Sequence, residues 1–236
     1  MSGYSSIHLI LFVFLIFGLL NVRADELPKA LPEDVSMSSE ELKKVDHVIQ
    51  KFINDKELAG AVTIIARKGK VIYFSAQGMQ DISAAKKMDK DSIFRIYSMT
   101  KAVVSVAAMR LVEQGQLKLD VPASTYIPSI AKMKFNGEIP NREMTLRDLL
   151  SHSSGLPNNV STDRALRAAG HPSLAESNLE EIMGRIESVP LKYEPGEGWD
   201  YSFAADVVGR LVEIGSGLRL DKALRNLIFD PLGMKD

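Results

Sequence analysis

The sequence of 236 residues predicts an α/β (α+β) protein in which a small sheet is accompanied by a mostly helical part. Two apolar, β-branched runs at 61–66 and 71–76 are separated by a short polar turn, which predicts a β-hairpin. Apolar residues at helical spacing predict helices over 38–54 and 98–114. The remainder has no long strand pattern and contains several short stretches at helical spacing. We therefore expect a mostly helical subdomain, rich in loops and prolines, over about 119–218.

Shorter helices are expected within and after this subdomain. Helical spacing places them at 146–150, 179–186, 203–214 and 220–229. Thr145 and Ser202 stand where N-cap residues belong, and Gly215 is suited to end the third helix. Residues 81–90 are expected to form a loop, and residues 94–96 a short extended segment.

The N-terminus has the features of an export signal. Residues 7–20 are almost entirely apolar but fall short of the roughly 20 residues that span a membrane. The run ends in Val22-Arg23-Ala24, which predicts a signal peptide over 1–24 and an exported, periplasmic or secreted protein. Because no Lys or Arg precedes the run, an uncleaved membrane anchor remains the alternative. We interpret 25–37 as a linker to a domain over 38–236.

Composition excludes several classes of function. The 30 acidic and 29 basic residues nearly balance, which argues against a nucleic-acid partner and against electrostatic membrane binding. Cysteine is absent and the four histidines are far apart in sequence, so the sequence predicts no metal site and no cofactor. The expected partner is a small-molecule ester, amide or peptide-like substrate.

The pattern Ser-x-x-Lys occurs three times, starting at Ser83, Ser98 and Ser129. Only Ser98 opens a long apolar helix, which places Lys101 one turn along the same face. A serine hydroxyl needs a base to become a nucleophile, and burial lowers the pKa of a lysine toward that role. The Ser98 N–H at the helix start is a candidate oxyanion donor. A capping serine followed by a surface lysine would fit the spacing as well.

Four segments resemble the class C β-lactamase and penicillin-binding-protein superfamily, to which certain carboxylesterases are related. They are Phe-Arg-Ile-Tyr-Ser-Met-Thr-Lys at 94–101, Met-Thr-Leu-Arg-Asp-Leu-Leu-Ser-His-Ser-Ser-Gly-Leu at 144–156, Pro-Gly-Glu-Gly-Trp-Asp-Tyr-Ser at 195–202, and Ile-Phe-Asp-Pro-Leu-Gly-Met at 228–234. They follow the order of that superfamily. The resemblance implies a β-lactamase/transpeptidase-like fold, with a sheet domain, a mostly helical domain and an active site between them.

The resemblance also implies roles for individual residues. It makes Ser98 the nucleophile and places Tyr201 against Ser98 and Lys101, where the phenol can pass a proton between nucleophile and leaving group. It makes His152 part of a structural turn. A Ser–His–Asp triad is disfavoured independently, because no Gly-x-Ser-x-Gly segment occurs in the chain. Trp199 is interpreted as a structural residue of the tyrosine turn, the segment 195–202 that contains Tyr201.

Two departures from the superfamily pattern shape the expected function. Phe203 stands where many members have an asparagine two residues after the tyrosine, so we expect it to line an apolar substrate pocket. This favours an esterase over a D-amino-acid peptidase or β-lactamase. No Lys/His-x-Gly segment precedes Asp236, so we expect the C-terminal strands to be missing from this chain. A catalytically inactive relative with a binding or scaffold role is the remaining alternative.

Overall fold

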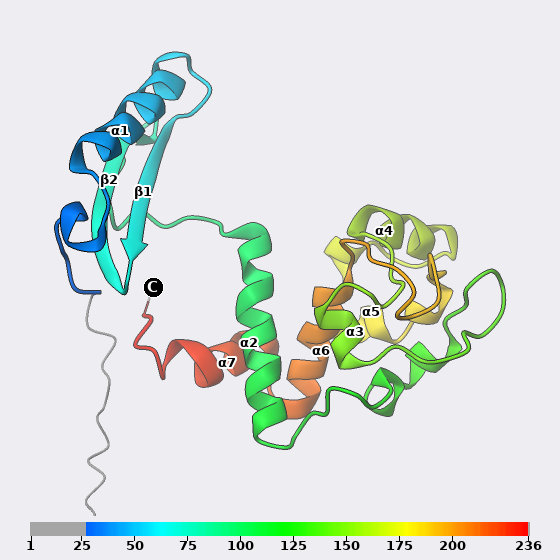
Figure 1. Ribbon diagram of the computed structural model, residues 1–236. Coiled ribbons are helices and arrows are strands. Elements are labelled where there is room, and N and C mark those ends of the chain that lie inside the picture. The colour runs from blue at the N-terminus through cyan, green and yellow to red at the C-terminus, as the bar shows by residue number, and fades with distance from the viewer. Residues whose placement is uncertain (1–26, 236) are drawn as a thin grey trace, which may run out of the picture. The chain divides into compact units, whose positions relative to one another are not determined.

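The computed structural model describes residues 27–235 and is shown in Figure 1. The chain divides into two compact units, unit 1 ending at Lys90 and unit 2 beginning at Asp91. Each unit is described by itself. The signal peptide expected at 1–24 lies outside the described residues. Within residues 27–235, no helix combines the length and the apolar character that crossing a membrane requires.

Unit 1 is built on an antiparallel hairpin. Strand β1 (Gly60–Arg67) pairs with β2 (Lys70–Asp81), and a short strand β3 (Lys86–Lys87) pairs with the end of β2. The predicted hairpin is therefore present. Strand β2 runs five residues beyond the predicted end at residue 76, and β3 lies in a stretch that was expected to be a loop.

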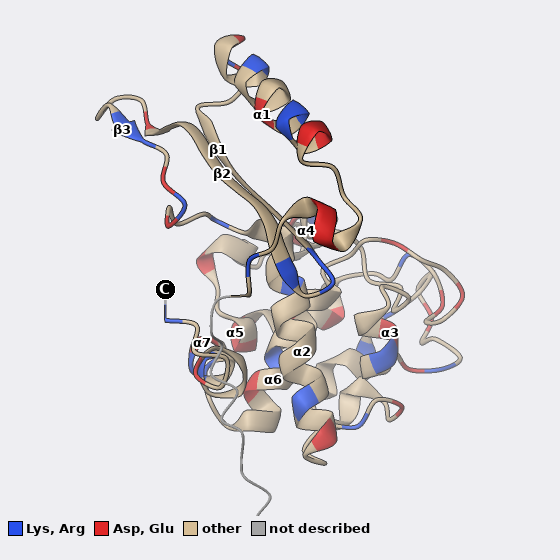
Figure 2. Ribbon diagram, turned by 60° about the vertical axis from the view of Figure 1, so that its left-hand side comes forward, with Lys and Arg blue, Asp and Glu red and all other residues tan. Residues whose placement is uncertain are grey.

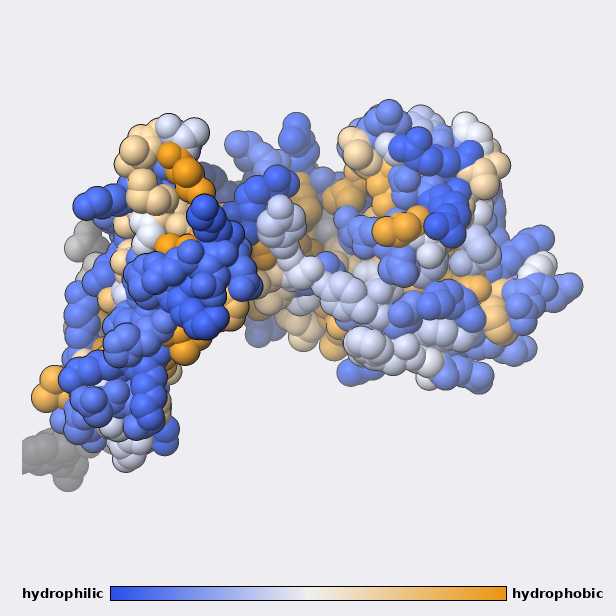
Figure 3. Space-filling model, turned by 90° about the horizontal axis from the view of Figure 1, so that it is seen from above, coloured by the Kyte–Doolittle hydropathy of each residue, from blue (hydrophilic) through white to orange (hydrophobic). Residues whose placement is uncertain are grey.

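One helix packs against this hairpin. Helix α1 (Ser39–Asn54) begins after Ser38, whose hydroxyl accepts the N–H of Glu41 at 3.2 Å. Leu42 on its inner face joins Ile72 of β2 in a small core. The outer face carries charges of both signs, as Figure 2 shows. Hydrophilic residues also predominate on the face seen in Figure 3, where apolar residues form separate small groups.

The segment interpreted as a linker is folded onto unit 1 where the structure describes it. Ala30 donates its N–H to the carbonyl of Val71 at 3.1 Å, and the Val71 N–H binds the carbonyl of Pro28 at 2.9 Å. A 3₁₀ turn, η1 (Pro32–Val35), follows, and Val35 is only 1% exposed in the core with Leu42. Backbone pairing and this buried valine make residues 28–35 part of the unit.

Unit 2 is organised around two helices that lie side by side, α2 (Thr100–Glu113) and α6 (Ala204–Ser216) (Figure 1). The inner faces of both helices lie in one apolar core, to which α2 contributes Ala107 and Leu111 and α6 contributes Val208 and Leu211. This core fixes the start of α2 relative to the start of α6.

Helix α2 differs from its prediction in two ways. It begins at Thr100 because residues Tyr97–Met99 form a separate 3₁₀ turn, η2. Because apolar residues surround it on most sides, the sequence predicted a helix that is buried nearly all round, whereas it is buried on one face only, since Val106 is 51% exposed and Met109 39% exposed. Residues 94–96, expected to be extended, belong to no strand.

Shorter elements complete unit 2. They are η3 (Ala123–Thr125), η4 (Pro128–Lys132), α3 (Leu146–Leu150), α4 (Asn159–Ala168), η5 (Leu174–Glu176), α5 (Leu179–Met183), η6 (Ile186–Ser188), α7 (Leu220–Leu224) and the π-helical turn η7 (Arg225–Phe229). Helix α3 has its predicted bounds and its predicted Thr145 cap. Helix α4 was not predicted, and the helix expected at 220–229 is divided between α7 and η7.

The buried carboxylate of Asp148 holds α3 to the chain around it. It accepts hydrogen bonds from the N–H and the hydroxyl of Thr145, at 2.9 and 2.8 Å. The guanidinium of Arg142 binds both of its oxygens, at 2.7 and 2.9 Å. Burial by itself raises the pKa of this carboxyl, but Arg142 and Thr145 outweigh burial and hold the pKa below its ordinary value.

Replacing this carboxylate should destabilise the fold. In Asp148→Asn one charged acceptor is lost from a site that is 6% exposed, so we expect a loss of about 1–3 kcal/mol in the free energy of unfolding near pH 7. Because the pKa is lowered on folding, the stabilisation is present above the unfolded pKa of about 3.9 and disappears as the pH falls through the folded value. Urea unfolding at pH 7 and at pH 3 measures both effects.

A second Asp–Arg pair provides the control. Asp120 and Arg147 also form a two-pronged ion pair, but their side chains are 69% and 61% exposed. Asp120→Asn should therefore leave the unfolding midpoint almost unchanged, because exposed ion pairs contribute little. Equal losses in the two variants would contradict a special role for Asp148.

Candidate active site

The Ser98 hydroxyl and the Lys101 ammonium are hydrogen-bonded in the structure. Their Oγ and Nζ atoms lie 3.3 Å apart. Ser98 lies in the 3₁₀ turn η2, whose three residues per turn place residue i+3 directly above residue i. Tyr97, immediately before the serine, has a φ of 44°, a left-handed value that costs free energy in a bulky residue. Backbone strain of this kind concentrates at functional sites.

The other two Ser-x-x-Lys patterns do not form such a pair. The Ser83 hydroxyl donates to Asp81 at 2.6 Å, and the Ser129 hydroxyl donates to the carbonyl of Met183. Lys132, the partner expected for Ser129, forms an ion pair with Glu187 at 3.0 Å. Both hydroxyls are thus engaged by acceptors within their own surroundings, and the Ser98 pair stands apart.

Tyr201 lies against this pair, from the turn before α6. The Lys101 ammonium is 4.8 Å from the centroid of the Tyr201 ring. A hydrogen bond from Lys101, followed in importance by one from Ser98, lowers the pKa of the Tyr201 phenol below its ordinary value. The structure therefore brings together the three predicted catalytic residues, with Ser98 and Lys101 at the start of α2 and Tyr201 at the start of α6.

Backbone hydrogen bonds between two turns position Tyr201. Residues 152–157 follow α3, and residues 192–203 lead into α6. Four N–H groups of the second segment bind carbonyls of the first: Lys192 to Gly155 at 2.8 Å, Gly196 to Ser153 at 2.8 Å, Asp200 to His152 at 3.1 Å and Phe203 to Pro157 at 2.9 Å. The tyrosine turn is therefore held by α3 and its following loop as well as by α6.

Two glycines allow this close approach. Gly155 has a φ of 83°, and a Cβ there would lie 2.4 Å from the carbonyl oxygen of Tyr193. Gly196 has a φ of 91°, and a Cβ there would lie 2.0 Å from the Arg142 guanidinium. Larger residues would separate the two turns, so the motif glycines serve the placement of Tyr201.

His152 is closer to the site than a structural turn residue needs to be. Its ring centroid lies 4.9 Å from that of Tyr201 and 6.3 Å from that of Trp199. Burial first, and then the charge of Lys101, lower the pKa of the imidazole, while Asp200 acts in the opposite direction. The resemblance implied a structural turn for the His-Ser-Ser-Gly segment, and no pattern in the sequence indicated this contact.

The prediction that Phe203 lines the substrate pocket is wrong. Its side chain is 1% exposed and belongs to the apolar core of unit 2. Because Phe203 directly precedes the first turn of α6, its side chain falls on the inner face of that helix. The Phe203 side chain therefore offers no surface to a substrate in this structure.

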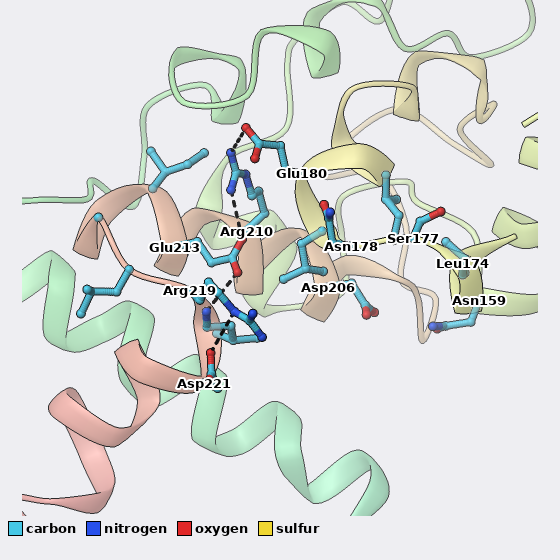
Figure 4. A pocket seen from close by; sticks show the side chains of 16 residues that line it. Asn159, Leu174, Ser177, Asn178, Glu180, Asp206, Arg210, Glu213, Arg219 and Asp221 are labelled. Carbon is cyan, nitrogen blue, oxygen red and sulfur yellow. Dashed lines mark hydrogen bonds and ion pairs between the residues drawn. The ribbon is translucent and has the colours of Figure 1, made fainter. Parts of the chain in front are cut away.

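A pocket of about 860 Å³ lies beside α6, lined also by residues of α5 and the start of α7 (Figure 4). Arg210 of α6 forms ion pairs with Glu180 of α5 at 2.9 Å and with Glu213, one turn further along α6, at 3.1 Å. Asp206 lines it as well. Burial raises the pKa of this carboxyl, against the opposing effects of Asn159 and Lys101. None of Ser98, Lys101 and Tyr201 belongs to the lining. Among residues 27–235, no cluster of His, Cys, Asp or Glu is placed to hold a metal ion.

Comparison with known proteins identifies a matching family and several relatives. Residues 45–236 match the family described as Beta-lactamase. The chain is 37% identical to Esterase EstB of Burkholderia gladioli over 198 residues, which cover 82% of this chain and 50% of EstB. It spans about half the length of the curated relatives it matches.

Solved structures agree with this match. The hydrolase EstCE1, described as having promiscuous acyltransferase activity, aligns with a TM-score of 0.75 and 32% identity over 82% of this chain and 52% of its own. The penicillin-binding protein homologue from Pyrococcus abyssi aligns with a TM-score of 0.67 and 27% identity over 82% of this chain and 43% of its own. The predicted β-lactamase/transpeptidase-like fold, with a small sheet and many helices, is confirmed, and the chain belongs to the Beta-lactamase family.

Proposed function

We propose that this chain carries the catalytic centre of a serine hydrolase that cleaves esters through an acyl-enzyme intermediate. The observation that carries the proposal is the 3.3 Å hydrogen bond between Ser98 and Lys101, with the Tyr201 ring centroid 4.8 Å from the Lys101 ammonium. Such a cluster contains a nucleophile and groups able to move its proton. The names of the relatives EstB and EstCE1 support hydrolase chemistry.

The proposed first step transfers the acyl group to Ser98. Tyr201, as a phenolate stabilised by the Lys101 ammonium, accepts the Ser98 proton while Oγ attacks the ester carbonyl carbon. The N–H of Ser98, in the first turn before α2, stabilises the developing oxyanion. Tyr201 then returns the proton to the departing alcohol as the carbon–oxygen bond breaks, leaving an ester on Ser98.

The second step is the same chemistry with water as the nucleophile. Tyr201 takes a proton from water as the water oxygen attacks the acyl carbon, and it returns this proton to Ser98 Oγ as the acid leaves. Lys101 remains charged and holds both oxygens in place. Its ammonium is the physical cause of the lowered phenol pKa, so the two residues act as one unit.

Two observations favour an ester over a lactam or peptide. The first is the 37% identity between this chain and EstB, which is described as an esterase. Phe203 also removes the amide that many superfamily members present two residues after the tyrosine, and its side chain is directed into the core. No amide at this position is therefore available to bind an amide substrate.

The nucleophile is tested by covalent labelling. Ser98→Ala should abolish labelling of the protein by a fluorophosphonate probe, because the Ser98 hydroxyl is paired with the Lys101 amine at 3.3 Å and lies beside Tyr201. Ser83→Ala and Ser129→Ala are the matched controls and should leave labelling unchanged, since their hydroxyls bind Asp81 and Met183. Labelling that persists in Ser98→Ala, read by intact-protein mass spectrometry, would refute the assignment.

The proton-transfer pair is tested by turnover and by titration. Lys101→Met and Tyr201→Phe should each reduce kcat by about 10² or more, and the double variant should lose little beyond either single one. In Lys101→Met the Tyr201 phenol pKa should rise toward its ordinary value of about 10. The pH at which kcat/KM rises should increase together with the phenol pKa, because the phenolate then forms at higher pH.

Tyr201→Phe identifies the relevant resonance among the six tyrosines in a ¹³C-tyrosine NMR titration. A phenol pKa that is the same with and without Lys101 would mean that the lysine does not prepare the base.

Substrate preference is tested by comparing kcat/KM for three classes of substrate. We expect short-chain p-nitrophenyl esters to be hydrolysed with a higher kcat/KM than the cephalosporin nitrocefin or a D-alanyl peptide amide. All three rates should vanish together in Ser98→Ala. A higher kcat/KM for nitrocefin than for every ester would reverse the ranking and indicate a β-lactamase.

A further inference from the structure

His152 makes a set of contacts that joins the tyrosine turn to the loop after α3. The Nδ1 atom of its ring lies 3.2 Å from the backbone N of Ser202, which donates to it, and 3.2 Å from the Ser202 hydroxyl. Its carbonyl oxygen accepts the Asp200 N–H at 3.1 Å and the Tyr193 hydroxyl at 3.1 Å. His152 therefore binds the residues on both sides of Tyr201.

The ring also forms one wall of the space that Tyr201 occupies. The two rings are 4.9 Å apart at an interplanar angle of 38°, and Lys101 approaches the Tyr201 ring at 4.8 Å. The tyrosine is 45% exposed, so solvent covers much of the rest of its surface. Movement of His152 would thus change the distance from the phenol to Ser98 and Lys101.

We propose that His152 is a positioning residue for Tyr201, acting as a neutral imidazole whose Nδ1 accepts the Ser202 N–H and whose ring supports the phenol. This rests on the proposed function of Tyr201. A backbone N–H can be accepted only by an unprotonated nitrogen, so the proton of the neutral ring is on Nε2. His152 touches no reacting atom in this scheme, and its effect passes through the tyrosine.

Protonation would dismantle this arrangement. Both ring nitrogens of a charged imidazole are donors, so Nδ1 would face the Ser202 N–H without a lone pair. The charged groups that act on His152 are Lys101 from α2 and Asp200 from the tyrosine turn; burial and Lys101 lower its pKa, and Asp200 raises it. The net shift is downward, so the neutral ring persists below the ordinary histidine pKa of about 6.5.

Two substitutions of His152 distinguish the effect of where its hydrogen-bond acceptor lies from the effect of its side-chain volume. The amide oxygen of His152→Asn reaches the place of Nδ1 and can accept the Ser202 N–H, whereas the longer side chain of His152→Gln places its amide nearer to Nε2. We expect His152→Gln to lower kcat by up to about 10²-fold with little change in KM, because the acid–base group is displaced and substrate contacts are not. His152→Asn should recover most of that loss. His171→Asn and His171→Gln are the controls and should leave kcat unchanged.

NMR provides readouts that do not depend on turnover. In ¹⁵N-labelled protein, His152 Nδ1 should show the shift of an unprotonated acceptor, and the Ser202 amide should titrate with the ring below pH 6.5. The Tyr201 phenol pKa should stay low in His152→Asn and rise in His152→Gln. Thermal unfolding of each variant confirms that the comparison is made on folded protein.

The outcomes separate this inference from the proposed function. A protonated Nδ1, or equal phenol pKa values in the Asn and Gln variants, would overturn the positioning role even if the protein is an active esterase. If the NMR results are as expected while fluorophosphonate does not label Ser98, the positioning role stands and the proposed catalytic function fails.

Discussion

The carboxylate of Asp148 is the constraint on which the arrangement of unit 2 depends. It caps α3 through Thr145, and it binds the guanidinium of Arg142 with both oxygens. The same guanidinium lies over Gly196, where any side chain would collide with it. Arg142 therefore binds the buried Asp148 at the start of α3 and packs closely against Gly196 in the turn that carries Tyr201.

The arrangement of the proposed catalytic residues follows from this constraint together with the packing of two helices. Helices α2 and α6 share one apolar core, so the start of α2 and the start of α6 are fixed side by side. The turn after α3 then determines where Tyr201 lies above α6, through four backbone hydrogen bonds. A hydrogen-bond network made of backbone groups is rigid, and rigidity is what the acid–base role proposed for Tyr201, on a half-exposed turn, requires.

Sequence reasoning succeeded where local chemistry determined the outcome. The hydroxyl caps at Ser38 and Thr145 and the polar turn of the hairpin each act over a few residues, so the pattern alone located α1, α3 and β1–β2. The preference for Ser98 among three Ser-x-x-Lys patterns also rested on a local feature, the apolar helix that follows it; the structure pairs Ser98 with Lys101, and the role of Ser98 as nucleophile stays a prediction. The resemblance to a superfamily was needed to add Tyr201.

Prediction failed where the outcome depended on distant contacts. Phe203 was assigned to a substrate pocket because of the residue it replaces, although helical spacing already placed it on the apolar side of α6. Residues 25–37 were interpreted as a linker, yet the described part pairs with β2 through Val71, a contact that no local pattern reveals. The contact of His152 with Tyr201 depends on a φ of 58° and on pairing between two turns, and neither is visible in composition or spacing.

The charge of Lys101 affects the protonation of both Tyr201 and His152. An ammonium stabilises a nearby anion and destabilises a nearby cation. The same group therefore lowers the pKa of the Tyr201 phenol, favouring the phenolate, and lowers the pKa of His152, favouring the neutral imidazole. Both shifts favour the states that the proposed mechanism uses, a charged base at Tyr201 and an uncharged acceptor at His152. Had His152 been protonated, it would have competed with Lys101 for the phenolate and released the Ser202 N–H from its acceptor. Lys101 thus acts directly on the proposed base, while burial and Lys101 together keep the supporting imidazole neutral.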